Sequence, residues 1–132
     1  MAGMKSRRKG KVVERALAEF LRDHGFAQAH RGQQYRGGEH SADVVGLPGI
    51  HIEAKGLKRF ETLHRWMEKC EAESFVEEDP AVFIKANGKR WLVCLDAKDF
   101  LDLMKELIEL RDRDFLIKPV KPTERDLSCE RH

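Results

Sequence analysis

Two short apolar runs joined by a proline-glycine turn constrain this chain more than any other feature of its sequence. Residues 42–45 (Ala-Asp-Val-Val) and residues 50–54 (Ile-His-Ile-Glu-Ala) are each typical of a β-strand, and the Pro-Gly pair at 48–49 favours a turn between them. A hairpin centred on this turn places Asp43 directly opposite Glu53, with Cβ atoms roughly 4.5–5.5 Å apart. The predicted hairpin therefore brings two carboxylates together.

Two facing carboxylates repel each other unless a cation lies between them. A hard divalent ion is the natural candidate, because Mg²⁺ commonly takes one or two carboxylates and completes its shell with water and substrate phosphate. Side chains alternate along a strand, so Lys55 projects from the same face as Glu53, while Ile52 and Ala54 point toward a core. The alternative is ordinary surface charge, and a slip of one residue in the pairing turns Asp43 away from Glu53.

Length and composition indicate a single soluble globular domain over residues 1–132. Hydrophobic residues make up 41% and charged residues 36% of the chain, and no apolar run approaches the ~20 residues that span a bilayer. We therefore expect no membrane association. The three cysteines are scattered and lack the spacing of a zinc site or a disulfide framework, which favours a reducing cytoplasm.

Positive charge is concentrated near the N-terminus. Residues 1–40 carry nine Lys or Arg against four Asp or Glu, whereas residues 68–79 carry six acids and one lysine. The first region is a plausible phosphate-facing surface and the second is expected to face away from nucleic acid. For the basic N-terminal arm, residues 1–9, the alternative is a disordered solubilising segment.

The remaining pattern predicts helices on both sides of a sheet. Gly25 ends the first helix, Pro80 ends the second, Asp96 N-caps the third, and the Asn-Gly pair at 87–88 favours a hairpin. A polar tail follows over 111–132. The first helix is expected over 10–24, with an apolar stripe of Val13, Ala16, Leu17, Phe20 and Leu21 and with Glu14 on the flank of that stripe. A flexible loop is expected over 36–40. The other expected elements are strands over 26–35, 42–45 and 50–54, a helix containing Leu63, Trp66, Met67 and Cys70, strands over 81–86 and 90–95, and a helix containing Phe100, Leu103, Met104, Leu107 and Ile108. This order predicts an α/β fold with a mixed central β-sheet of about five strands flanked by helices.

A known nuclease pattern has a glutamate on the first helix, an aspartate on a strand and a Glu-x-Lys on the next strand. The chain has these residues in the same order, as Glu14, Asp43, Glu53 and Lys55. In this respect the chain resembles the PD-(D/E)xK nuclease superfamily, which has the restriction-endonuclease-like fold, and within it the Holliday junction resolvases of archaea and phages. The resemblance covers about residues 9–103 and also includes the segments 9–15 (Lys-Gly-Lys-Val-Val-Glu-Arg), 25–26 (Gly-Phe), 37–38 (Gly-Gly), 41–44 (Ser-Ala-Asp-Val) and 52–55 (Ile-Glu-Ala-Lys), together with Arg31. The chain departs from the family pattern at Ala42, where many members have proline, and in the second helix, where His64 lies near the position of a glutamine.

The resemblance implies metal-assisted hydrolysis of a DNA phosphodiester. Asp43, Glu53 and the Ala54 carbonyl oxygen would hold Mg²⁺ or Mn²⁺, with Glu14 completing the metal shell directly or through water. Lys55 would orient the attacking water or stabilise the developing negative charge. The expected DNA-contacting residues are Arg7, Arg8, Lys9, Lys11, Arg31, Arg36 and Ser41.

The expected substrate is a four-way DNA junction and the expected assembly is a homodimer, because resolving a junction needs paired cuts. Two alternatives stay open. The first alternative is a repair, restriction-like or replication-associated nuclease with another DNA substrate. The second is a DNA-binding module on a degenerate nuclease fold. For Arg31 and Arg36 the alternative to a phosphate contact is a surface salt bridge.

Overall fold

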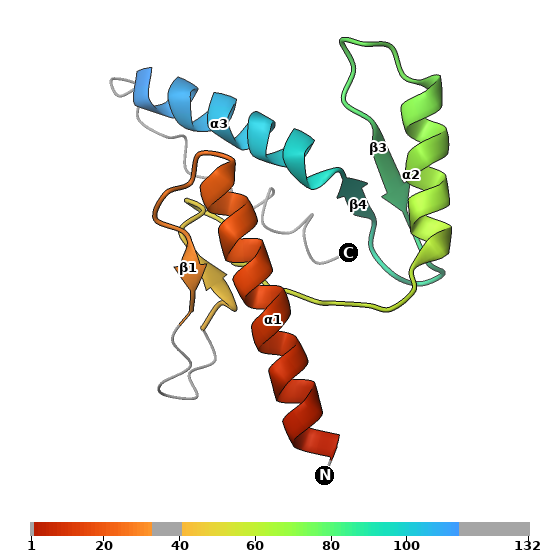
Figure 1. Cartoon of the computed structure of the whole chain (residues 1–132). Coiled ribbons are helices and arrows are strands. Elements are labelled where there is room, and N and C mark those ends of the chain that lie inside the picture. The colour runs from red at the N-terminus through yellow and green to blue at the C-terminus, as the bar shows by residue number, and fades with distance from the viewer. Residues whose placement is uncertain (1, 33–40, 114–132) are drawn as a thin grey trace. The chain divides into compact units, whose positions relative to one another are not determined.

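The computed structural model describes residues 2–32 and 41–113 (Figure 1). The chain divides into two compact units, Met1–Phe60 and Glu61–His132. Arg36, the predicted flexible loop around it and most of the predicted polar tail lie outside the described residues. In the described residues the strands form two separate two-stranded sheets. The single domain and the five-stranded sheet expected from the sequence stay predictions.

The first unit is built on α1, Ala2–Asp23. This helix begins at Ala2 and not near residue 10, so the predicted basic arm is helical where it is described. It ends as predicted at Gly25, which has a φ of 99°. The Phe26 N–H bonds to the Leu21 carbonyl and the Gly25 N–H to the Arg22 carbonyl, and this pair of bonds is the Schellman arrangement that stops a helix.

The buried face of α1 differs from the predicted apolar stripe. Ala18 and Leu21 are almost fully buried, and Glu14 is buried one turn before Ala18. Ala16, which the apolar spacing places in the stripe, is exposed. The buried face is therefore rotated so that Glu14 lies within it, because the Arg31 side chain donates a hydrogen bond to that carboxylate.

Two short antiparallel strands lie against α1, namely β1, His30–Arg31, and β2, Val44–Val45. They pair His30 with Val45 and Arg31 with Val44. The predicted strand over 26–35 was wrong at its start, because residues 26–29 form a turn in which the Ala29 N–H bonds to the Phe26 carbonyl. The core of this unit comprises the buried side chains of Ala18, Leu21, Phe26, Ala29, Val44 and Leu47.

The turn at 47–50 has the predicted position. The Ile50 N–H donates to the Leu47 carbonyl at 3.2 Å and Gly49 has a φ of 78°, which with Pro48 before it is the pattern of a type II turn. Beyond the turn, Val44 forms an isolated antiparallel bridge with Ile52. The predicted pairing register is confirmed at this bridge. The predicted strand over 50–54 is otherwise absent from the described residues, which show only this bridge there.

The second unit contains α2, Glu61–Glu73, the hairpin β3, Ala81–Ile84, with β4, Leu92–Leu95, and α3, Ala97–Arg113. The hairpin runs in register from the pair Ala81–Leu95 to the pair Ile84–Leu92, and α2 contacts β3. The strands are shorter than predicted at their turn ends. Within the described part of the chain, no helix combines the length and apolar character that crossing a membrane requires.

The helix ends in this unit depend on polar side chains. Asp96 caps α3 as predicted, because its Oδ1 accepts hydrogen bonds from the Lys98 and Asp99 N–H groups at 2.8 and 3.3 Å. The prediction that Pro80 ends the second helix was wrong. Helix α2 stops at Glu73, where the Ser74 hydroxyl donates to the Cys70 carbonyl at 2.6 Å. Helix α3 continues to Arg113, into the predicted tail.

Candidate functional site

Asp43 is fixed by its backbone and by its side chain. Its N–H donates to the Ile52 carbonyl and its carbonyl accepts from the Gly32 N–H, both at 2.9 Å. Its carboxylate Oδ2 accepts a hydrogen bond from the Ala54 N–H at 2.8 Å. The aspartate is therefore held against the peptide group that joins Glu53 to Ala54, by a bond that was not predicted from the sequence.

Glu53 precedes that peptide group, Lys55 follows Ala54, and both residues are exposed. The Glu53 Oε1 atom lies 3.7 Å from the His51 Nε2 atom, and both side chains keep more than half of their surface in water. Such a contact is weak, since exposed ion pairs are worth about 0–1 kcal/mol. Glu53 and Lys55 are thus free to turn toward a ligand at low cost, whereas Asp43 is already positioned.

Glu14 has a different environment from the other predicted site residues. Its side chain is 10% exposed, and its Oε2 atom accepts a hydrogen bond from Arg31 Nε at 2.8 Å. The Arg31 side chain is 28% exposed, so the pair is partly buried between α1 and β1. Of the two alternatives for Arg31, the salt bridge is the one observed. This pair ties β1 to the helix and satisfies the charge that Glu14 carries inside the unit.

The residues around Asp43 fit a divalent cation of the magnesium type in their donor chemistry. Across residues 2–32 and 41–113, no three His, Cys, Asp or Glu side chains gather into a metal-binding group. Mg²⁺ does not require three, because it uses one or two carboxylates and keeps several waters. Hard oxygen donors are supplied by the carboxylates of Asp43 and Glu53 and by the Ala54 carbonyl. The hydrogen bond from the Ala54 N–H uses Oδ2 of Asp43 and leaves Oδ1 out of that bond.

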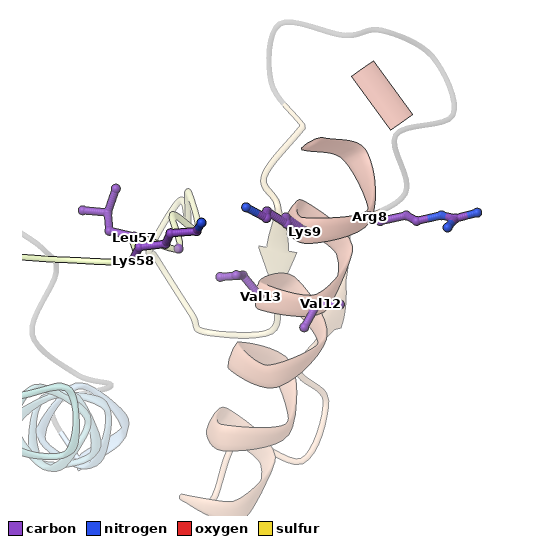
Figure 2. A pocket seen from close by; sticks show the side chains of 7 residues that line it. Arg8, Lys9, Val12, Val13, Leu57 and Lys58 are labelled. Atoms are coloured by element: carbon purple, nitrogen blue, oxygen red, sulfur yellow. The ribbon is translucent and has the colours of Figure 1, made fainter. Parts of the chain in front are cut away.

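The chain beyond Lys55 returns to α1 and forms a groove with it. A Cβ atom at Gly56 would lie 2.5 Å from Val13 Cγ2, so the backbone at Gly56 packs directly on the helix. The groove has a volume of about 430 Å³ (Figure 2). Its lining combines cations with apolar side chains, namely Arg8, Lys9, Val12, Val13, Gly56, Leu57 and Lys58.

The sequence-based prediction missed Gly56, Leu57 and Lys58. The available signal was a glycine directly after Lys55, which permits close backbone approach, followed by the basic pair at 58–59. Of the predicted DNA-contacting residues, Arg7, Arg8, Lys9 and Lys11 are exposed on α1, and Ser41 is exposed just before Asp43. Arg8 and Lys9 line the groove.

No family model, curated protein or solved structure matches this chain. Its function is therefore inferred from the hydrogen bonds, exposure and charges of the residues described above.

Proposed function

We propose that this protein is a metal-dependent, structure-selective DNA endonuclease that hydrolyses phosphodiester bonds at four-way junctions. The observation that carries the proposal is the hydrogen bond from the Ala54 N–H to Asp43 Oδ2. It fixes the Asp43 carboxylate against the peptide group that follows Glu53, and Lys55 comes directly after Ala54. A carboxylate pair with an adjacent lysine is suited to metal-assisted phosphodiester hydrolysis.

Each residue of the proposed site has a separate task. Asp43 and Glu53, with the Ala54 carbonyl, would hold the divalent ion, Mg²⁺ or Mn²⁺. When bound, the ion would supply a Lewis acid and lower the pKa of water. Lys55 would orient the attacking water or stabilise the negative charge that develops on the phosphoryl oxygens, a role that suits a compact ammonium charge. Glu14 supports the site through Arg31, and its predicted place in the metal shell stays a prediction.

The charge of the first unit supports DNA as the substrate. Residues 1–60 carry twelve Lys or Arg against six Asp or Glu. The exposed basic residues of α1 are suited to phosphate contacts, since counterion release drives most of the affinity for DNA. Cys70 and Cys94 are free thiols, in keeping with a cytoplasmic location in a prokaryotic or phage-infected cell.

We also propose that the protein acts as a homodimer. One chain offers one proposed metal site, and two cuts in opposing strands of a junction are most simply made by two copies related by a twofold axis. The second unit has exposed large apolar side chains that suit an interface. Trp66 on α2 is 48% exposed, and Trp91, next to β4, is 62% exposed.

The test is cleavage of a labelled four-way junction beside linear duplex, flap and single-stranded DNA, with Mg²⁺ and with excess EDTA. We expect paired cuts in opposing strands of the junction, and only with the metal. Efficient metal-dependent cutting of a flap or duplex in place of the junction would favour the repair or restriction-like alternative. Tight DNA binding with no cutting of any substrate would favour a DNA-binding module.

A further inference from the structure

We infer that the groove between α1 and residues 56–58 binds one unpaired nucleotide of the DNA, next to the proposed catalytic site. This inference rests on the proposed function for the class of ligand, and it adds a specificity for DNA with unpaired bases. It is carried by the charges, the apolar surface and the position of the groove.

The charges of the groove favour an anion in its centre. Figure 2 shows the Lys9 and Lys58 side chains pointing toward one another, one from each wall, while Arg8 points away. No carboxylate is among the seven described residues that line the groove. Two ammonium groups that face each other repel, and a phosphate between them removes this repulsion and makes two favourable ionic interactions.

The apolar surface of the groove favours a nucleotide over a free phosphate. Val12 and Leu57 line the groove beside these lysines and are 64% and 65% exposed. Val13 adds apolar surface to the wall formed by α1. A base or sugar placed on this surface removes apolar area from water, which is worth about 25 cal/mol per Å². The groove volume of about 430 Å³ falls within the range of about 300–1,000 Å³ for small-molecule sites.

The apolar surface also favours an unpaired nucleotide over duplex DNA. The bases of a duplex are stacked and paired, so its outer surface offers phosphates to Lys9 and Lys58 and leaves Leu57 in water. A nucleotide without a partner offers its phosphate and its base together. The groove begins at Gly56, directly after Lys55, so the nucleotide would adjoin the phosphodiester that is cut.

The experiment measures binding of the full chain to a fluorescent single strand and to the matching blunt duplex, in EDTA, over a range of salt. For the double variant Lys9→Gln/Lys58→Gln we expect single-strand affinity to fall at least tenfold more than duplex affinity. For the single strand, the plot of log affinity against log salt should have a shallower slope in this double variant than in the natural protein. The difference should be about 0.7 for each phosphate contact that is lost with the two lysines. For Leu57→Ser we expect a severalfold loss of affinity for the single strand with an unchanged slope.

Lys11→Gln is the matched control, because Lys11 is exposed on the same helix and does not line the groove. It should weaken single-strand and duplex binding equally. Equal losses of affinity for both DNAs with the groove variants, or no loss with Leu57→Ser, would overturn the inference. Binding is measured without metal, so it does not depend on cleavage. If the groove variants lose single-strand affinity but the natural protein cuts no DNA when Mg²⁺ is added, the groove inference holds and the proposed nuclease function fails. Unchanged melting temperatures would exclude misfolding as the cause.

Discussion

The two units of this chain differ in the residues that their closest ion pairs join. In the first unit, polar side chains join residues far apart in the sequence, as in the Glu14–Arg31 pair and the bond from Ala54 to Asp43. In the second unit, the described salt bridges lie within single helical turns, as in the contacts of Asp102 with Lys98 and Lys105 on α3. The contacts in the first unit join different elements and fix their relative positions, whereas the salt bridges on α3 join neighbouring turns of one helix.

The difference extends to charge, and each unit exposes its large apolar side chains in a different setting. The first unit is basic, while the second carries thirteen Lys or Arg against seventeen Asp or Glu. The second unit also leaves large apolar side chains of its hairpin exposed, with Phe83 at 67% and Trp91 at 62%. The first unit therefore combines positioned polar groups with positive charge, and the exposed apolar side chains of the second unit lie on a hairpin in a unit of net negative charge.

The largest expected effect is on cleavage, and it tests the first unit. Glu53→Gln and Lys55→Ala should each abolish cutting of a four-way junction, because one removes a proposed metal ligand and the other the charge proposed to lie beside the scissile phosphate. Neither should lower the melting temperature, since both side chains are exposed. Glu19→Gln, on an exposed position of α1, is the matched control and should cut normally. Normal cutting by Glu53→Gln would remove the proposed role of that residue.

The next effect is on stability and concerns the partly buried pair. Glu14→Gln should lower the free energy of unfolding by about 2–3 kcal/mol, below the 3–5 kcal/mol of a fully buried pair, because Arg31 retains some contact with water. Urea unfolding measures this loss. A double-mutant cycle with Arg31→Met should recover a coupling energy of at least about 1 kcal/mol. A coupling near zero would show that the pair does not join α1 to β1.

A smaller loss of stability separates two roles of Asp43. Asp43→Ala removes the acceptor of the Ala54 N–H and should cost about 1–3 kcal/mol, the penalty for an unsatisfied polar group. Asp43→Asn keeps a side-chain oxygen in the same place and should cost less than about 1 kcal/mol. Thermal unfolding of the two variants side by side measures the difference. Equal melting temperatures would mean that the hydrogen bond does not position the aspartate.

The smallest effect concerns the second unit. Lys98→Gln should change the free energy of unfolding by less than about 0.5 kcal/mol, because its partner Asp102 lies one helical turn away and both side chains are exposed. Urea unfolding in low and in high salt tests this value. A loss as large as that of Glu14→Gln would contradict the contrast between the two units.

Features of the fold set by local chemistry were predictable from the sequence. Gly25 ends α1, Asp96 caps α3, and the turn at Pro48 sets the bridge between Val44 and Ile52. Each depends on residues close together in the chain, where backbone preference and short hydrogen bonds decide the structure.

Features that depend on contacts between distant residues were not predictable. The spacing of apolar residues on α1 put Glu14 at the flank of the buried face, because only the approach of Arg31 makes burial of that carboxylate favourable. The groove was missed for a similar reason. It exists because Gly56 packs on Val13, two residues whose contact no local pattern predicts.

The most direct test of the account is cleavage of a strand-labelled four-way junction by the natural protein and by Asp43→Asn, with Mg²⁺. We expect symmetric cuts by the natural protein and none by the variant, which should keep its fold and its affinity for the junction. Asp23→Asn makes the same chemical change at an exposed position of the same unit and should cut normally. Undiminished cutting by Asp43→Asn, or full activity of the natural protein in excess EDTA, would contradict the account.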